Sequence, residues 1–218
     1  MITAECGHHG CPTGATETLY TLPTLVTVVR TAASLAIGVT GIAHGSLTLL
    51  LWGLGVYWVG DVADGALARL LDRETRAGAV ADILSDRLCA STFYLGFVSV
   101  RPGMAVPVAI YLANFLVVDA VLSMAFLAWP LTSPNYFHLV DRRVWWWNWS
   151  KIGKGINSAA IAVLMVVTKS AWLTGVLAAV ILAIKIASLV RLQRIGTPAV
   201  RGCAVVAAAK HPLAAPSV

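Results

Sequence analysis

Six long apolar stretches constrain this chain more than any other feature of its sequence. They begin near residues 24, 46, 79, 104, 152 and 171, and each is long enough for the roughly 20 residues that a membrane-spanning helix needs. Amphipathic soluble helices would show a polar stripe with a period of 3.6 residues, whereas runs such as 47–57 and 171–184 show none. The sequence therefore predicts an all-α, polytopic membrane bundle of six transmembrane helices.

Composition and charge support a membrane protein. Of the 218 residues, 58% are hydrophobic and 12% charged, against roughly 25% charged in an ordinary soluble domain. The net charge of +6 is no sign of a nucleic-acid partner, because the basic residues lie mostly between or after the apolar stretches, as the positive-inside rule requires. We expect membrane lipids as neighbours, both termini in the cytoplasm, and the cell membrane as the location.

The two ends differ in composition from the apolar region. We expect a polar cytoplasmic tail over residues 1–20, a membrane domain over 21–192 and a disordered cytoplasmic tail over 193–218. Residues 1–20 contain no apolar core of a cleavable signal peptide. Cys6, His8, His9 and Cys11 could form a small metal tract, but a disordered tail is favoured, because no second ligand pair follows to close a zinc site.

Four aspartates in the second and third stretches are the densest group of charges. Charged side chains in membrane helices are costly and usually mark function. Asp61 and Asp64 are three residues apart, and Asp82 and Asp86 are four apart, so each pair projects from one helix face. The short connection between the stretches makes these helices antiparallel neighbours, so the carboxylates meet at one depth. Four converging carboxylates need cations, and oxygen ligands select Mg²⁺ or Mn²⁺.

Small residues and an arginine accompany these acids. Gly65, Ala66 and Ala68 leave room for a bulky ligand against the helix backbone, and Arg69 offers a planar fork for a phosphate. Small residues can also simply ease helix packing in membranes, and two acids near a helix end can simply be solvated. Those interpretations explain neither the four acids together nor the glycine and arginine between them, so we expect phosphate chemistry at one edge of the bilayer.

The spacing of these residues resembles a known signature. It is D-x2-D-G-x2-A-R-x8-G-x3-D-x3-D, and its fixed positions are Asp61, Asp64, Gly65, Ala68, Arg69, Gly78, Asp82 and Asp86. The pattern resembles that of the CDP-alcohol phosphotransferase (phosphatidyltransferase) family, and eight fixed residues are far more specific than a lone glycine motif.

Two further segments extend this resemblance. Residues 22–30, L-P-T-L-V-T-V-V-R, are similar to the P-N-x-L-T-x-x-R start of the first helix in these enzymes, with Thr24 in place of the usual Asn. The segment from Ser150 to Lys154 is similar to the S-K-x-G-K of the glycerol-type branch.

The resemblance implies transfer of a phosphatidyl group from CDP-diacylglycerol to an alcohol, with CMP leaving. It implies two divalent cations, Mg²⁺ or Mn²⁺, bound by Asp61, Asp64, Asp82 and Asp86, with Asp86 also the general base on the acceptor hydroxyl. By the same resemblance, the CDP site would be lined by Asp64, Gly65, Ala68, Arg69 and Gly78. The family often forms homodimers, so a homodimer is compatible with it.

The acceptor alcohol is less constrained, because the signature determines the donor only. Glycerol-type relatives use glycerol 3-phosphate or phosphatidylglycerol. Residues 80–87, V-A-D-I-L-S-D-R, are closer to inositol-using relatives than to the L-D-P-L-A-D-K of many glycerol-type members. Asp119 resembles the acidic residue that cardiolipin synthases carry in the fourth helix. We favour phosphatidylglycerol as acceptor, hence cardiolipin synthesis, with glycerol 3-phosphate and an inositol-type alcohol as alternatives.

Several charged residues are candidates for an acceptor site. Arg30 and Asp119 are intramembrane charges that could pair with each other or line an acceptor pocket. The tryptophan-rich run 144–149 is typical of a membrane interface. The basic residues around it could anchor that interface or receive an acceptor's phosphate; they are Arg142, Arg143, Lys151 and Lys154.

Two other classes of function are compatible with membrane carboxylates. A cation transporter would have acids near the midplane on broken helices, whereas these acids cluster at one edge beside an arginine and small residues. A catalytically idle family member, kept as a structural or lipid-binding subunit, is disfavoured by the complete signature.

Overall fold

The computed structural model describes residues 18–129 and 131–196, and this part of the chain contains helices and no strand. The helices are α1 Leu22–Ala43, α2 Leu47–Leu70, α3 Arg76–Val100, α4 Ala105–Ala113, α5 Asp119–Met124, α6 Arg142–Asn148, α7 Lys151–Lys154, α8 Ile161–Thr168 and α9 Ala171–Ile195. Two π-helical segments, Asn114–Val118 and Gly155–Ala160, join α4 to α5 and α7 to α8. The cysteine and histidine tract and most of the C-terminal tail lie outside the described residues.

The all-α prediction is confirmed, and helices begin close to each of the six predicted positions. Four of them are long and apolar enough to cross a membrane: Leu22–Ala43, Pro102–Ala128, Lys151–Thr168 and Ala171–Ile195. Helices α2 and α3 are equally long, with 24 and 25 residues. Their apolar character is lower because they carry the charged residues of the signature.

Polar side chains just before the long helices explain where these helices begin. The hydroxyl oxygens of Thr21, Ser46, Thr75 and Ser170 each accept a hydrogen bond from the backbone N–H three residues later. Such caps satisfy one of the N–H groups that a helix start leaves without an intrahelical partner. Because the connections are short, consecutive long helices fold back on one another.

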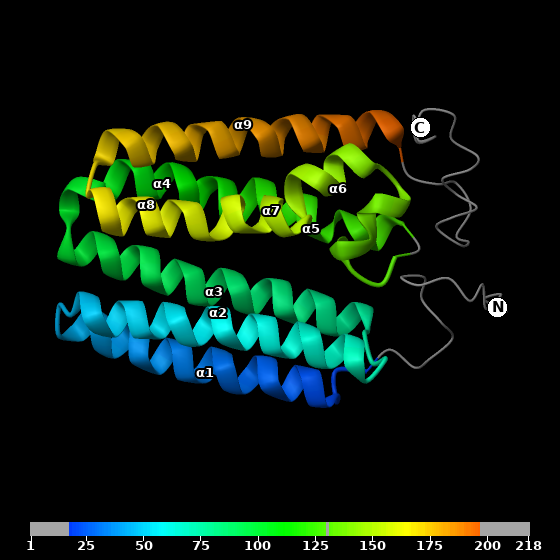
Figure 1. Ribbon diagram of the computed structural model, residues 1–218, viewed down its shortest axis with the longest axis horizontal. Helices are drawn as coiled ribbons and strands as arrows, with labels where there is room; N and C mark the ends of the chain where they lie inside the picture. Colours follow the sequence, from blue (N-terminus) through cyan, green and yellow to red (C-terminus); the bar gives the residue numbers. More distant parts are fainter. Residues whose placement is uncertain (1–17, 130, 197–218) are drawn as a thin grey trace, which may run out of the picture.

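The long helices form a bundle with two sides (Figure 1). Helices α1, α2 and α3 pack on one another, and α4 packs chiefly on α9. Helix α1 begins, α2 ends, α3 begins and α9 ends at the same end of the bundle, where α6 also lies (Figure 1). The charged residues of the α2–α3 connection are therefore gathered at that end.

Helices α1 and α2 approach each other very closely. A Cβ at Gly53 would lie 3.1 Å from the carbonyl oxygen of Ser34 and 3.2 Å from the amide nitrogen of Gly38. The Ser34 hydroxyl donates a hydrogen bond of 2.9 Å to the Gly53 carbonyl oxygen. Small residues that permit close backbone contact are the usual basis of helix packing in lipid, and here they hold α1 against the helix that carries Asp61 and Asp64.

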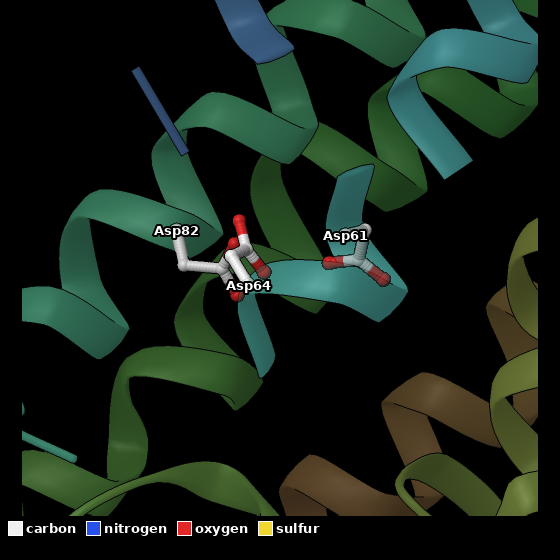
Figure 2. Close-up of side chains that lie close together, drawn as sticks. All are labelled: Asp61, Asp64 and Asp82. Atoms are coloured by element: carbon white, nitrogen blue, oxygen red, sulfur yellow. The ribbon is translucent and has the colours of Figure 1, made fainter. Parts of the chain in front are cut away.

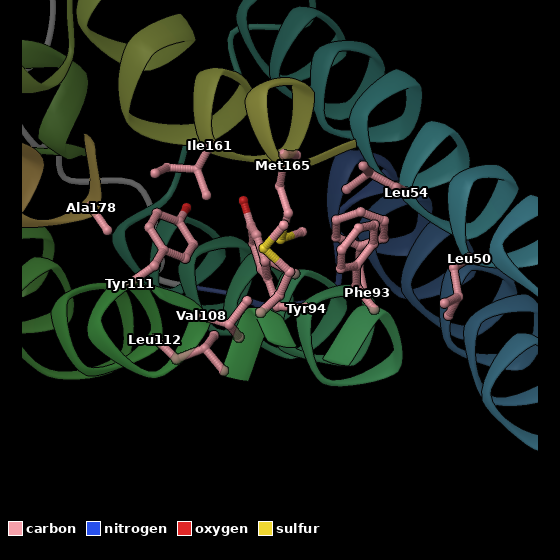
Figure 3. Packing of buried hydrophobic residues seen from close by; sticks show 14 of the residues in the cluster. Leu50, Leu54, Phe93, Tyr94, Val108, Tyr111, Leu112, Ile161, Met165 and Ala178 are labelled. Carbon is pink, nitrogen blue, oxygen red and sulfur yellow. The ribbon is translucent and has the colours of Figure 1, made fainter. Parts of the chain in front are cut away.

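Two apolar clusters stabilise the bundle. In the larger one, side chains of α2, α3, α4, α8 and α9 meet, with Tyr94 and Tyr111 near its centre (Figure 3). The second joins the connection before α6 to the ends of α3, α5 and α9, and it includes Phe126, Phe137 and Leu192. This second cluster fixes the segment 131–150 over the end of the bundle where the signature residues lie.

The Gly53 contact leads to a stability prediction. We expect Gly53→Ala to lower the free energy of unfolding by roughly 1 to 3 kcal/mol, because the added methyl group must separate two helix backbones. Gly55→Ala is the matched control, since a Cβ at Gly55 meets no atom within 4 Å. Thermal unfolding of both variants in detergent is the measurement, and equal midpoints would contradict the close-contact interpretation.

Candidate active site and metal centre

Helices α2 and α3 bring three signature carboxylates together. Each of Asp61, Asp64 and Asp82 offers one carboxylate oxygen, and these oxygens lie within 4.8 Å of one another. Figure 2 shows the Asp64 and Asp82 carboxylates side by side, with Asp61 next to Asp64 on α2. Oxygen donors at such separations fit a hard divalent cation, so the residues suit the metal that the resemblance implies.

Arg30 of α1 lies at the centre of the acidic group. Its Nε donates a hydrogen bond of 2.7 Å to Asp64, and its Nη2 donates to Asp82 at 2.5 Å and to Asp86 at 2.9 Å. The same nitrogen is 3.6 Å from Asp61. Arg30 is 4% exposed, so all four signature aspartates share one buried guanidinium.

The neighbours of Arg30 are adapted to its position. A Cβ at Gly60 would lie only 2.5 Å from Cδ and 2.6 Å from Cβ of Arg30, so any side chain there would displace the arginine. The guanidinium carbon is 5.5 Å from the centroid of the Tyr57 ring, within the range of cation–π attraction. Thr27 donates a hydrogen bond of 2.7 Å to the carboxylate oxygen of Asp64 that Arg30 also contacts. Asp64 is therefore the most firmly held of the four acids.

A first cavity, which we call the signature cavity, opens beside Asp64. Its volume is about 90 Å³, and it is lined by the small residues and arginine of the signature, Gly65, Ala68, Arg69 and Gly78, together with Asp64 and Asp82. The Arg69 side chain is exposed, and in the described part of the chain it has no hydrogen-bond or ion-pair partner. It is available to an anionic ligand. Thr24 lines the same cavity and its hydroxyl is 2.8 Å from that of Thr21.

A second cavity lies on the other side of Asp82. Its volume is about 190 Å³ and Asp61, Asp82 and Asp86 form one wall. The lining of this cavity also includes three buried charged residues, Arg87 of α3, Asp119 of α5 and Lys185 of α9. We call these three residues the triad and this space the triad cavity. The two cavities share four lining residues, Ala79, Asp82, Ser133 and Asn135, so they adjoin each other at the acidic group.

The segment before α6 forms the shared wall, and several contacts hold it. The Tyr136 hydroxyl donates a hydrogen bond to the Glu74 carboxylate. Burial and this bond raise the pKa of Tyr136 well above its ordinary value, so the phenol stays protonated and keeps donating. Asp141 caps α6 by accepting from the Val144 amide at 2.8 Å, and it also accepts from Arg191 of α9 at 2.7 Å.

Arg30, one of the six residues expected at an acceptor site, lines neither cavity, and the other five divide into two groups. Asp119 and Lys154 line the triad cavity. Arg142, Arg143 and Lys151 are exposed and line neither cavity. They lie beside Trp146 and Trp147, which are 52% and 39% exposed, an arrangement typical of a membrane interface.

Of the two alternatives for Arg30 and Asp119, a direct ion pair between them is not formed in the structure. Arg30 contacts the signature carboxylates. Asp119 instead accepts from Arg87 at 2.9 Å and lies 2.5 Å from Nζ of Lys185. The sequence could not decide between the alternatives, because positions on separate helices do not reveal which helix faces meet.

Lys185 and the buried amides of the triad cavity were not anticipated. Lys185 is a lone charge inside the apolar run of α9, a signal that could have identified it. Asn114 and Asn157 lie in the two π-helical segments and line the triad cavity. Such π-helical turns frequently occur at functional sites, but they leave no distinct signal in the sequence.

The all-α fold, the four strongly apolar helices and the acidic centre define a membrane protein with a candidate cation site between two cavities. Residues 20–187 match the family model described as CDP-alcohol phosphatidyltransferase. The chain therefore belongs to that family, whose members are transferases that move phosphate-containing groups with a CDP-alcohol as substrate. No protein of curated function and no solved structure gave a significant match.

The position of Arg30 leads to a prediction about cations. In the presence of a chelator, Arg30→Gln should lower the free energy of unfolding by about 3 to 5 kcal/mol, because the carboxylates lose their buried counter-charge. Added Mn²⁺ should recover part of the loss by neutralising the same carboxylates. Thermal unfolding with chelator and with Mn²⁺ measures both effects.

Arg101→Gln is a suitable control, since Arg101 is exposed at the other end of α3. A chelated Arg30→Gln protein as stable as the unmodified chain would show that the carboxylates need no cation.

Proposed function

We propose that this chain transfers a phosphatidyl group from CDP-diacylglycerol to an alcohol and releases CMP. The observation that carries the proposal is the position of the acidic group, where Asp82 borders the signature cavity and the triad cavity. A transferase must hold its donor and acceptor on either side of the reacting phosphorus, and two cavities that adjoin at a cation site meet that requirement.

In this proposal the CDP part of the donor lies in the signature cavity. Gly65, Ala68 and Gly78 keep the cavity open next to the helix backbones. A Cβ at Gly78 would lie 2.8 Å from the Thr75 hydroxyl oxygen that caps α3, so a larger residue there would disturb that cap. Arg69 and Asp64 line the same cavity, and the guanidinium of Arg69 offers the hydrogen bonds that a phosphate needs.

Two divalent cations, Mg²⁺ or Mn²⁺, belong to the proposal, with Asp61, Asp64, Asp82 and Asp86 as their ligands. The oxygen-only donor set and the separations among the first three carboxylates support this assignment. When bound, such ions stabilise negative charge on a leaving pyrophosphate oxygen and orient an in-line displacement. Arg30 would then share Asp64, Asp82 and Asp86 with them and hold those carboxylates in place.

Asp86 is proposed as the general base. Its carboxylate lines the triad cavity, so an alcohol held there can give its hydroxyl proton to Asp86. The alcohol oxygen then bonds to the phosphorus that carries the diacylglycerol, and the bond from that phosphorus to the CMP oxygen breaks. The products are a phosphodiester lipid and CMP, and the proton stays on Asp86 until it leaves to solvent.

For the acceptor we propose phosphatidylglycerol, which makes the product cardiolipin and places the chain in the glycerol-type branch. The lining of the triad cavity by Asp119 and by Lys154 of the S-K-x-G-K segment supports this choice. In that segment Ser150 caps α7, and a Cβ at Gly153 would lie 2.8 Å from the carbonyl oxygens of Trp146 and Trp147. Glycerol 3-phosphate is the alternative, and an inositol-type alcohol is less favoured.

We propose six membrane spans, with both termini and the active site on the cytoplasmic side of the cell membrane. Large apolar side chains on the outer faces of α2 and α3 support lipid contact by these helices as well; they are Trp52, Val59, Val62, Leu84, Leu88 and Leu95, all at least half exposed. We propose residues 21–192 as the membrane domain. The family resemblance also favours a homodimer.

The activity prediction concerns the purified chain in detergent with Mg²⁺ or Mn²⁺. CDP-diacylglycerol and phosphatidylglycerol should together release CMP, and a chelator should abolish the release, because the leaving pyrophosphate oxygen loses its charge stabilisation. Asp86→Asn should lower kcat by roughly 10² to 10⁴-fold, the usual contribution of a general base.

Parallel reactions with glycerol 3-phosphate and with myo-inositol identify the acceptor. CMP release with one of them in place of phosphatidylglycerol would change the product but not the reaction class. No release with any alcohol, or full release by Asp86→Asn, would refute the mechanism.

Membrane topology provides a separate prediction. Single cysteines placed at Asp72 and at Arg142 should react with a membrane-impermeant thiol reagent only from the cytoplasmic side. A cysteine at Lys169 should react only from the other side, because α8 and α9 meet there after crossing the membrane. Labelling of all three positions from one side would rule out the proposed spans.

A further inference from the structure

The triad carries an unbalanced charge in a buried place. Arg87, Asp119 and Lys185 are 7%, 8% and 3% exposed. Nη2 of Arg87 is 2.9 Å from one carboxylate oxygen of Asp119, and Nζ of Lys185 is 2.5 Å from the other. Among the described residues, Asp119 is the only carboxylate that forms an ion pair with either cation. Two cations therefore share one anion, and the triad has a net charge of one positive unit.

A buried charge without a counter-charge is costly, so the triad favours an anion in the cavity it lines. The signature carboxylates Asp61, Asp82 and Asp86 line the same cavity, but their ion pairs are with Arg30 and not with the triad, and in the proposed function they are cation ligands. Lys154 lines the same cavity and has no ion-pair partner in the described part of the chain. Apart from the signature carboxylates Asp61, Asp82 and Asp86, the cavity is lined by three cationic side chains and by one carboxylate, that of Asp119.

The lining also contains polar atoms that lack partners. Arg87 Nε, Asn114 Oδ1 and Asn148 Oδ1 are buried and make no hydrogen bond, although Asn114 and Asn148 are only 1% and 3% exposed as residues. All three residues line the triad cavity. Buried polar groups are almost always hydrogen-bonded, so these atoms indicate a ligand that brings both hydroxyl donors for the amide oxygens and an acceptor for the guanidinium.

We propose that the triad cavity recognises an acceptor that is a polyol bearing a phosphate group. Arg87 and Lys185, oriented by Asp119, bind the phosphate together with Lys154, while Asn114 and Asn148 accept hydrogen bonds from hydroxyl groups. Asp86 and Arg87 both line this cavity, so a phosphate at Arg87 can hold a neighbouring hydroxyl of the same molecule near the proposed base. This inference rests on the proposed function and defines the class of its acceptor.

The same charges disfavour other alcohols. An amino alcohol would bring an ammonium group next to the triad, which already has a net charge of one positive unit, and like charges in a buried site repel strongly. An uncharged polyol would satisfy the amide oxygens but would leave the triad without its anion. A phosphate offers several acceptor oxygens to the guanidinium and both ammonium groups, which a hydroxyl cannot. The phosphate can belong to a soluble polyol phosphate or to the headgroup of a phosphodiester lipid.

The experiment compares matched alcohols in the CMP-release reaction of the full chain. Glycerol 3-phosphate is paired with glycerol, myo-inositol 1-phosphate with myo-inositol, and phosphatidylglycerol supplies the lipid source of the phosphate. We expect release only with phosphate-bearing alcohols, and the active one among them identifies the source. An uncharged alcohol with an equal or higher kcat/KM would overturn the inference while leaving the proposed reaction intact.

Binding separates the inference from the reaction. Isothermal titration with glycerol 3-phosphate and with glycerophosphoglycerol, the phosphatidylglycerol headgroup, needs no CDP-diacylglycerol. Binding of either compound that is weakened about tenfold or more by Lys185→Gln would support the inference even without CMP release, since a charge-assisted hydrogen bond contributes at least that factor. Equal binding by the variant would overturn it.

Variants distinguish recognition from structural support. Lys185→Gln should raise the KM of the phosphate-bearing acceptor about tenfold or more and leave the KM of CDP-diacylglycerol unchanged, and Lys185→Arg should restore the acceptor KM. Lys169→Gln, which changes an exposed lysine at the far end of α9, is the control.

If Lys185→Gln does not fold, Asn114→Asp tests the same cavity, because its added negative charge should weaken phosphate binding. Unchanged acceptor KM and binding in the folded variants would overturn the inference.

Discussion

The contact between Arg30 and the signature aspartates is the interaction on which the rest of the site depends. Four carboxylates from two helices would repel one another in a place that is partly shielded from water. One guanidinium reaches all four of them, at distances between 2.5 and 3.6 Å. The close packing of α1 on α2, the absence of a side chain at Gly60 and the ring of Tyr57 all serve to hold that guanidinium. The first helix is therefore part of the acidic centre although it contributes no acid.

Irregular helix geometry shapes the other side of the molecule. Helices α4 and α7 each continue into a π-helical segment, and these segments present Asn114, Asn157 and Ser158 to the triad cavity. A regular helix would turn the same side chains to different directions, since each π-helical turn contains an extra residue. The deviation from ideal helices thus occurs where α4 and α7 border the triad cavity.

Much of the fold and the acidic centre followed from the sequence, because they depend on local patterns. The apolar stretches predicted the long helices, and the spacing of Asp61, Asp64 and Asp82 predicted that their carboxylates converge. The partners of Arg30 and Asp119 could not be predicted in this way, because they depend on which helix faces meet across the bundle. Lys185 could have been found as a lone charge in an apolar run, whereas the π-helical segments leave no comparable signal.

The division of the cavities between the two sides of the bundle has a consequence for how such a protein can diversify. The signature cavity is lined almost wholly by α1, α2 and α3 and the ends of their connections, whereas Asp119, Asn148, Lys154 and Lys185 of the triad cavity come from later helices. Helices α2 and α3 contribute charged residues to both, and Asp82 is the charged residue that the two cavities share. Apart from Ser133 and Asn135, which line both cavities, substitutions after residue 100 can therefore remodel the triad cavity while the signature cavity keeps its shape. During evolution, substitutions in the C-terminal half alone could change the substrate bound in the triad cavity, while the signature cavity and its chemistry are inherited unchanged.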